Sequence, residues 1–196
     1  MAGRAIGRLT AMARCIVVSG PPCAGKSTLA RALAARYGFA LLAKDAYKEQ
    51  LFDRFGVGDR RWSARVSLLA WEMLLAEAAR LLVRDTDCLL EGNFRAPQAV
   101  VLAVLATAAG LRFTELRCLA RPEVLLARYR TRATDGSRHP GHVDLEALPG
   151  LGSELARSPR AVLSVGSVLD CDTSDGLDVA GVAARLEAAL GVEPRG

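Results

Sequence analysis

The sequence predicts an α/β fold built around a mostly parallel sheet. Short apolar runs alternate with helical patterns along most of the chain, and a glycine-rich motif joins the first apolar run to the first helix. Alternating strand and helix signals are typical of βα units whose strands run parallel. A length of 196 residues suits one domain. We therefore expect a single domain over residues 14–196, preceded by a flexible N-terminal extension, residues 1–13.

The strand and helix signals follow one another in a regular order. Gly38 and Gly110 stand where a left-handed residue commonly ends a helix, which supports helix ends at residues 37 and 109. Strands are expected at residues 14–19, 39–43, 87–91, 112–119 and 164–171. Helices are expected at residues 26–37, 45–55, 63–84, 97–109, 122–133 and 176–190.

Residues 134–162 interrupt this alternation. The segment holds four glycines and three prolines, so we expect at most one short helix in it, around residues 143–147. A loop of this length in a compact domain is usually functional or mobile. Because the segment follows an arginine-bearing helix and precedes the last strand, it is predicted to be a lid that closes over bound ligands.

The most informative motif begins at Gly20 and matches GxxxxGK[ST] between a predicted strand and a predicted helix. Its two glycines allow a tight turn whose backbone N–H groups face a phosphate. Its lysine reaches the β- and γ-phosphates and its serine holds Mg²⁺. We therefore expect ATP and Mg²⁺ to bind here. The expected nucleotide-binding residues are Gly20, Pro21, Pro22, Cys23, Ala24, Gly25, Lys26, Ser27 and Thr28.

Composition narrows the class of protein. A hydrophobic content of 51% excludes a mainly disordered chain, and no apolar run reaches the roughly 18 residues that a membrane span requires. We recognise no signal peptide and expect a cytoplasmic protein. Five cysteines without a CxxC pair predict reduced thiols. The net charge of +5 suits phosphate-bearing ligands without identifying nucleic acid.

Two acidic residues directly follow predicted strands. Asp45 follows the second strand and begins a helix, where its carboxylate would orient an attacking hydroxyl or would only cap the helix. Glu91 ends the third strand, where many proteins with this motif place an acid that holds Mg²⁺. It is a candidate metal or substrate contact, or a structural turn residue. Asn93 and Arg95 follow at the same sheet edge and are candidate substrate-binding residues.

Two arginines precede the predicted lid. Arg128 and Arg132 are four residues apart on a predicted helix, so their side chains project from one face. Guanidinium groups stay charged and bond phosphate oxygens in a fork. The pair is therefore predicted to clamp the transferring phosphoryl group when the lid closes, with a solvated helix face as the alternative. Arg138, further into the lid, is a candidate third member.

Several other residues keep two interpretations. Lys44 and Lys48 are either solvated helix positions or substrate contacts, in a chain that has 23 arginines and only three lysines. His139 and His142 are expected to shape the lid or contact the acceptor rather than bind zinc, since no further ligands lie nearby in the sequence. Trp71 belongs to the core or lines an acceptor pocket.

These motifs together resemble the small P-loop kinases. They are the glycine-rich loop, Lys44-Asp45 after the second strand, Glu91-Gly92-Asn93-Phe94 after the third, and the arginine pair before the lid. The chain is similar to the chloramphenicol phosphotransferase-like and zeta-toxin-like kinases and to the kinase half of polynucleotide kinases, over roughly residues 14–190. The resemblance implies a P-loop NTPase fold: a three-layer αβα sandwich with five parallel strands in the order 2-3-1-4-5.

The resemblance also implies an activity. We expect an ATP-dependent kinase that transfers the γ-phosphoryl group to a hydroxyl of a small molecule, a metabolite or an antibiotic, with Lys26, Asp45, Arg128 and Arg132 as catalytic residues. The alternatives are a polynucleotide 5′-hydroxyl kinase and a non-kinase ATP-binding switch or ATPase module. The polynucleotide kinase is not favoured, because no aromatic stripe interleaved with basic residues is present to stack bases.

Overall fold

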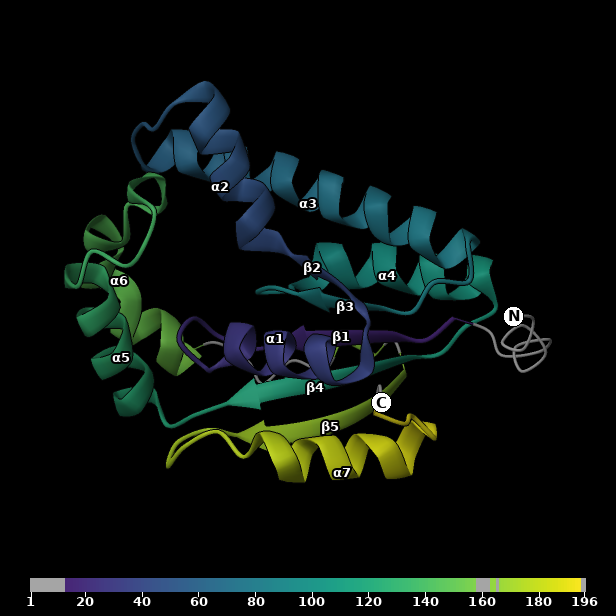
Figure 1. Cartoon of the computed structure of the whole chain (residues 1–196). Helices are drawn as coiled ribbons and strands as arrows, with labels where there is room; N and C mark the ends of the chain where they lie inside the picture. The colour runs from purple at the N-terminus through teal and green to yellow at the C-terminus, as the bar shows by residue number, and fades with distance from the viewer. Residues whose placement is uncertain (1–12, 158–162, 165, 195–196) are drawn as a thin grey trace, which may run out of the picture.

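The computed structural model describes residues 13–157, 163–164 and 166–194. Residues 1–12 of the predicted extension and residues 158–162 of the predicted lid lie outside the described residues. Five strands form one sheet in the order β2-β3-β1-β4-β5, and every neighbouring pair is parallel (Figure 1). The strands are β1 (Cys15–Ser19), β2 (Ala40–Ala43), β3 (Cys88–Glu91), β4 (Phe113–Leu119) and β5 (Gly166–Asp172).

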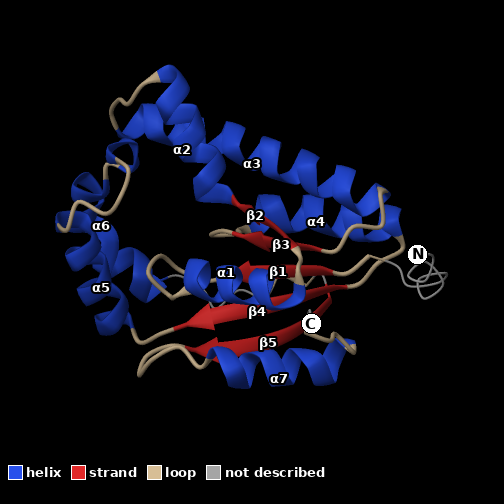
Figure 2. Ribbon diagram, viewed as in Figure 1, coloured by secondary structure: helices blue, strands red, loops and turns tan. Residues whose placement is uncertain are grey.

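Helices cover both faces of this sheet, as Figure 2 shows. Helices α1 and α7 pack on one face, whereas α3 and α4 pack on the other. The helices are α1 (Lys26–Tyr37), α2 (Lys44–Phe55), α3 (Arg60–Val83), α4 (Ala96–Ala109), α5 (Pro122–Thr134), α6 (Asp144–Arg157) and α7 (Val179–Leu190), with a short 3₁₀ helix η1 (Pro140–His142). The predicted three-layer αβα sandwich with strand order 2-3-1-4-5 is therefore confirmed.

The central strands are apolar because both of their faces are covered. In β1, Ile16 and Val18 belong to the core beneath α1 and α7, and Val17 belongs to the core beneath α3 and α4. All three side chains are fully buried. A strand covered by helices on both faces gives a continuous apolar run rather than an alternating one.

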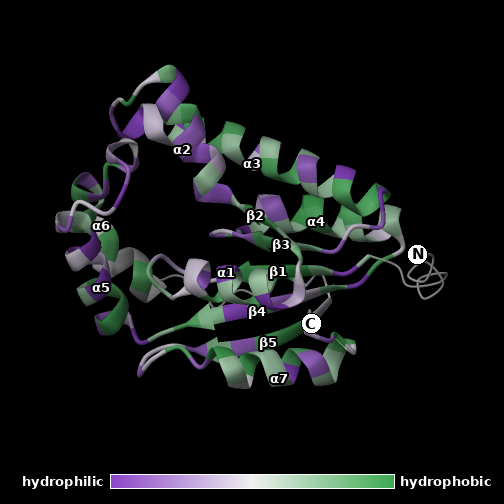
Figure 3. Ribbon diagram, in the orientation of Figure 1, coloured by the Kyte–Doolittle hydropathy of each residue, from purple (hydrophilic) through white to green (hydrophobic). Residues whose placement is uncertain are grey.

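The carboxyl ends of the strands all meet at one edge of the sheet, where α2, α5 and α6 lie (Figure 1). Glu91 at the end of β3 is in register with Val18 of β1 and with Ala43 of β2. The glycine-rich loop after β1 and the start of α2 after β2 are therefore neighbours of Glu91. Figure 3 shows polar residues on α2 and on the segment that leads from α5 to α6.

The lid prediction needs one correction. Residues 144–157 form a helix of 14 residues, where we expected a loop with at most a short helix around residues 143–147. Pro149 lies inside this helix, yet Leu151 and Leu155 are buried in the core beneath α1. Burial of an apolar face thus outweighs the helix-breaking tendency of proline and glycine in this segment.

Smaller differences concern the ends of elements. Helix α3 begins at Arg60 rather than at residue 63, because the Asp59 side chain accepts a hydrogen bond of 2.8 Å from the backbone N–H of Trp62. This contact is an N-cap, which sets the first turn of a helix.

Within the described part of the chain, no helix combines the length and the apolar character that crossing a membrane would require.

The lid packs against α2 through an aromatic contact. Phe52 of α2 stacks on the His139 ring at a centroid distance of 5.3 Å and meets the edge of the His142 ring at 5.8 Å. Gly141 lies between these two histidines, and a Cβ atom there would overlap the Phe52 ring. The turn can approach α2 closely only because residue 141 lacks a side chain.

Substitution of this glycine tests the packing. We expect Gly141→Ala to lower the free energy of unfolding by about 1–3 kcal/mol, because the added methyl group overpacks the contact with Phe52. Gly150→Ala is the matched control, since a Cβ atom at this position in α6 meets nothing within 4 Å. It should raise stability by about 0.5–1 kcal/mol through helix propensity. Urea unfolding measures both changes, and equal effects would contradict the packing argument.

Candidate active site

A cavity of about 740 Å³ lies at the carboxyl ends of the strands, between the glycine-rich loop and the lid. Its walls come from the loop, α2, α3, the end of β3, α5 and α6. Eight lysine and arginine side chains and three carboxylates line it. Such an excess of positive charge in a concave site suits ligands that carry several negative charges.

The glycine-rich loop forms one wall of this cavity. Gly20 has φ 131°, and a Cβ atom there would overlap the backbone carbonyl of Cys118 in β4. Gly25 has φ 78° and precedes α1 without any side-chain cap on that helix. Uncapped backbone N–H groups at a helix N-terminus form a binding site for anions. Cys23 also has a positive φ, 63°, and burial raises the pKa of its thiol.

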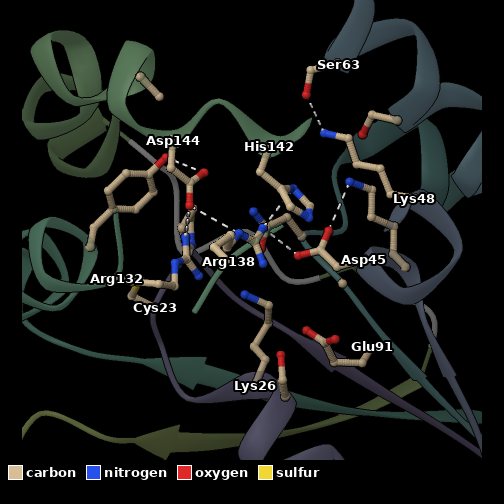
Figure 4. A pocket seen from close by; sticks show the side chains of 18 of the residues that line it. Cys23, Lys26, Asp45, Lys48, Ser63, Glu91, Arg132, Arg138, His142 and Asp144 are labelled. Atoms are coloured by element: carbon tan, nitrogen blue, oxygen red, sulfur yellow. Dashed lines mark hydrogen bonds and ion pairs between the residues drawn. The ribbon is translucent and has the colours of Figure 1, made fainter. Parts of the chain in front are cut away.

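Lys26 and Ser27 begin α1 and face the end of β3. The Lys26 Nζ donates a hydrogen bond of 2.7 Å to the Pro21 carbonyl, and burial lowers the pKa of this ammonium. Ser27 lies near the Glu91 carboxylate and acts to lower its pKa. Burial raises the pKa of Glu91, and nearby Lys26 opposes that rise. Figure 4 shows Lys26 and Glu91 directed into the same space.

Asp45 lies opposite Lys26 at the start of α2 (Figure 4). Its carboxylate accepts hydrogen bonds from Lys44 Nζ at 3.2 Å and from Arg138 Nη2 at 2.8 Å. Burial acts to raise the pKa of Asp45, but Lys44 and Arg138 outweigh it and hold the pKa well below its usual range. Asp45 is therefore ionised at every physiological pH.

His142 supports Arg138 from the lid. The Nδ1 atom of His142 lies 3.0 Å from Arg138 Nη2, and its Nε2 atom lies 2.9 Å from Glu49 Oε1 of α2. A guanidinium can only donate and an ionised carboxylate can only accept, so these contacts require neutral His142 with its proton on Nε2. Burial, helped by the Arg138 charge, lowers the pKa of His142 to about 3.

Asp144 joins Arg132 of α5 to Arg138 of the predicted lid. Its Oδ1 accepts a hydrogen bond of 2.9 Å from the Tyr129 hydroxyl. Its Oδ2 lies 3.4 Å from Arg132 Nη2 and 3.1 Å from Arg138 Nε, as ion pairs without hydrogen-bond geometry. Within the described residues, the buried Nε atoms of Arg132 and Arg138 thus have no hydrogen-bond acceptor. Buried donors of this kind are rare unless a ligand or water satisfies them.

Arg128 makes contacts that the sequence did not predict. It lines the cavity with Arg132, but its guanidinium binds Thr173 after β5, through the carbonyl oxygen at 2.6 Å and the hydroxyl at 3.2 Å. It also reaches the Cys23 carbonyl at 3.4 Å. Arg128 therefore connects the glycine-rich loop to the end of β5, whereas Arg138 is the arginine that reaches Asp45.

The remaining predicted substrate residues lie at the side of the cavity. Asn93 and Arg95 both line it after the end of β3. Arg95 is exposed at the N-cap of α4, where its backbone N–H donates to the Gln98 side chain at 3.1 Å. Trp71 of α3 is 8% exposed, and its ring centroid lies 4.7 Å from that of Phe94. It also lines the cavity, so Trp71 belongs both to the core and to the wall of the pocket.

A family comparison agrees with this arrangement. A family model described as an AAA domain matches residues 15–155. The chain belongs to this AAA domain family. The match covers the glycine-rich loop, Asp45 and Glu91. It also covers Arg128, Arg132 and Arg138. No curated protein matches the sequence.

Solved structures extend the comparison. The chain is similar to a "putative kinase" from Chloroflexus aurantiacus, with 34% identity, a TM-score of 0.85, and coverage of 92% of this chain and 100% of that one. A sugar kinase from Janibacter sp. matches with 18% identity and a TM-score of 0.60, over 92% and 95% of the two chains. A tunicamycin resistance protein from Deinococcus radiodurans matches with 18% identity and a TM-score of 0.57, over 94% and 99%. The last two show the fold alone, and the expected resemblance to small P-loop kinases is confirmed.

Several residues of this AAA-domain site were missed by sequence reasoning. Lys48 was given a solvated helix position as its first interpretation, yet it is 7% exposed and lines the cavity. Ser63, Tyr129 and Asp144 were not considered at all. Only Asp144 had a usable sequence signal, since an acidic residue at the start of a helix after a glycine-rich turn often faces basic side chains.

The neutral state of His142 predicts a dependence of stability on pH. A histidine whose folded pKa lies below its unfolded value of 6.5 gives stability that is complete above pH 6.5 and lost as pH falls toward 3. Between pH 7 and pH 5 we expect the free energy of unfolding to fall by about 1–2 kcal/mol from this group.

Urea unfolding at the two pH values measures this loss. His142→Gln keeps a donor and an acceptor without titrating, so it should remove most of the loss. His139→Gln is the control, because the only other histidine contacts exposed Asp53 at 3.2 Å and should leave the loss unchanged. Equal pH dependence in wild type and His142→Gln would contradict the assignment.

Proposed function

We propose that this protein is an ATP-dependent kinase that transfers the γ-phosphoryl group to a hydroxyl of a small molecule. One observation carries the proposal: Lys26 of the phosphate loop, Asp45 of α2 and Arg138 of the lid meet around a single cavity. Phosphoryl transfer needs mainly positioning and charge stabilisation, which these three groups are suited to supply. The 34% identity to a protein described as a "putative kinase" supports the same activity.

The phosphate loop suits the triphosphate of ATP. Its backbone conformation and the uncapped N-terminus of α1 present N–H groups to an anion, and Lys26 supplies a charge beside them. Arg132 and Arg138 line the same cavity. Phosphate oxygens would bind their guanidinium groups, and Arg128 would hold the loop in place through the Cys23 carbonyl.

The residues at the end of β3 fit a magnesium ion. The Ser27 hydroxyl and the Glu91 carboxylate line the same cavity and offer the oxygen ligands that Mg²⁺ prefers. Mg²⁺ in nucleotide sites commonly takes only one or two protein ligands and completes its shell with phosphates and water. When bound, Mg²⁺ neutralises charge on the phosphate oxygens.

Asp45 is placed to orient the acceptor hydroxyl. An ionised carboxylate accepts a hydrogen bond from the hydroxyl and aligns its oxygen for in-line attack. The low pKa of Asp45 makes it a weak base. In a loose transition state, however, the acceptor hydroxyl needs to lose little of its proton before the new P–O bond forms. Its contact with Arg138 would keep the lid arginine beside the transferring group.

Protein covers part of the cavity, which favours a small acceptor over a polynucleotide. The segment Arg138–His142 contacts α2 through Asp45, Glu49 and Asp53, which places protein over the space beside the acceptor carboxylate. A nucleic-acid strand would need an open groove with exposed aromatic side chains for stacking. Trp71 and Phe94 instead pack against each other.

Replacement of the acceptor carboxylate tests the proposal. We expect Asp45→Asn to lower kcat about 10²- to 10⁴-fold, because the neutral amide orients the hydroxyl less strongly and no longer forms the ion pair that holds Arg138. Affinity for a non-hydrolysable ATP analogue should change less than about threefold, since the phosphate loop is untouched. Transfer of labelled γ-phosphate to a panel of hydroxylated metabolites and antibiotics measures turnover, and calorimetry measures the affinity.

Asp53→Asn is the matched control. Asp53 is on the same helix but has a side chain that is 72% exposed and does not line the cavity. It should retain wild-type turnover. Undiminished turnover in Asp45→Asn would refute the role of this carboxylate. ATP hydrolysis without transfer to any hydroxyl compound would refute the kinase itself and favour an ATPase module.

A further inference from the structure

Lys48 is a buried cation in the wall of the cavity for which the proposed chemistry gives no role. It lies on α2 one turn after Lys44, and only 7% of the residue is exposed. Its Nζ atom donates a hydrogen bond of 2.8 Å to Ser63 Oγ and lies 5.3 Å from the centre of the Phe52 ring. Among the described residues, no carboxylate forms an ion pair with it.

The nearest carboxylate of α2 is already neutralised. Asp45 pairs with Lys44 at 3.2 Å and with Arg138 at 2.8 Å, so it has little charge to share with Lys48. Ser63 is neutral and itself buried, with 4% exposed. Burial therefore lowers the pKa of Lys48 to about 8, and the neighbouring Lys44 charge adds to this effect. A buried charge without a counterion costs free energy unless a ligand provides one.

Lys48 lies where a bound ligand could supply the missing negative charge. Lys48 and Ser63 line the cavity beside Asp45, and Arg60 lines it from the start of α3 (Figure 4). All three lysines of the sequence line this same cavity. Lys26 hydrogen-bonds to Pro21 of the phosphate loop, whereas Lys44 pairs with Asp45 at 3.2 Å and Lys48 lies on the same side as Asp45 (Figure 4). The acceptor side thus holds more positive charge than its own carboxylate can balance.

We propose that the acceptor carries an anionic group, a carboxylate or a phosphate monoester, which binds Lys48 and Ser63 while its hydroxyl lies at Asp45. The proposal rests on the kinase function proposed above and names its substrate class. Ser63 accepts from Lys48, so its own proton remains available to the anion.

The positions of the two contacts favour a compact acceptor. Asp45 and Lys48 are three residues apart on α2, so they share one face and their backbone positions are separated by a rise of about 4.5 Å along the helix. A compact acceptor that carries a hydroxyl and an anionic group would contact both side chains. Small hydroxy acids and phosphorylated sugars or polyols have this arrangement.

A purely structural role for Lys48 makes a different prediction. If its hydrogen bond to Ser63 and its contact with Phe52 serve the fold, Lys48→Met should lower the melting temperature of the free protein. If the charge serves a ligand, Lys48→Met should leave the melting temperature unchanged or raise it. Methionine fills a similar volume without the cost of an unpaired buried charge.

Binding of simple anions tests the proposal without any need for turnover. The nucleotide site is first saturated with the Mg²⁺ complex of a non-hydrolysable ATP analogue, so that added anions cannot occupy the phosphate loop. Thermal shifts are then measured with inorganic phosphate, with D-gluconate and with neutral D-glucitol. We expect one of the two anions, but not glucitol, to raise the melting temperature. The phosphate and gluconate arms distinguish a phosphate monoester from a carboxylate.

Two variants make the binding test specific. Lys48→Met should reduce the affinity for the effective anion at least tenfold. Arg65→Met removes the same charge from an exposed position of α3 that does not line the cavity, and should retain the wild-type response. Equal responses in wild type and Lys48→Met, or no response of wild type to either anion, would overturn the proposal. So would a lower melting temperature of free Lys48→Met with its anion response retained.

Turnover gives an independent readout. With an anionic acceptor that is phosphorylated, Lys48→Met should lower kcat/KM at least tenfold, almost entirely through KM, because Lys48 binds a part of the acceptor that does not react. A fall in kcat with unchanged KM would contradict this role. If no hydroxyl compound is phosphorylated while anion binding still depends on Lys48, the kinase function fails and the anion site stands.

Discussion

The ion pair between Arg138 and Asp45 is the contact on which the rest of the site depends. It joins the lid to α2 directly above the phosphate loop, and neutral His142 and Asp144 hold the same guanidinium from the lid side. One side chain thereby joins the predicted lid to the candidate acceptor carboxylate and favours the ionised form of that carboxylate. Because the interactions share one guanidinium, changes at any of these positions should affect the others rather than add independently.

The balance of charges in the cavity favours ligands that carry negative charge. Eight cations and three carboxylates line it, and the carboxylates are already engaged with lysine or arginine side chains. ATP would neutralise the cations around the phosphate loop and in the lid, but it would leave Lys48 without a counterion. The lid that we propose would exclude water and strengthen these interactions. The same excess charge that disfavours the empty cavity therefore favours the loaded one.

The sequence predicted the elements that have local signals. The glycine-rich loop, the strand-end acids Asp45 and Glu91, and the order of strands and helices all follow from motifs or periodicity, or from the resemblance that they support. Helix α6 was missed because Pro149 and its neighbouring glycines are local signals for a loop, whereas the burial of Leu151 and Leu155 is decided by tertiary packing. The burial of Lys48 could not be predicted for a related reason: a helix position gives no sign of burial until α3 packs against α2.

The choice between lysine and arginine reflects the chemistry of the cavity. In a chain with 23 arginines and three lysines, exposed cations are almost always arginine, so composition alone would place arginine at positions 26, 44 and 48 as well. Arginine stays charged and binds through a rigid fork, which suits the lid residues that hold carboxylates and phosphates from outside. A lysine is a compact point charge that fits beside a hydroxyl or an anion in a narrow buried space, and burial can shift its pKa. Lys26 and Lys48 are each only 7% exposed, and burial lowers the pKa of both side chains.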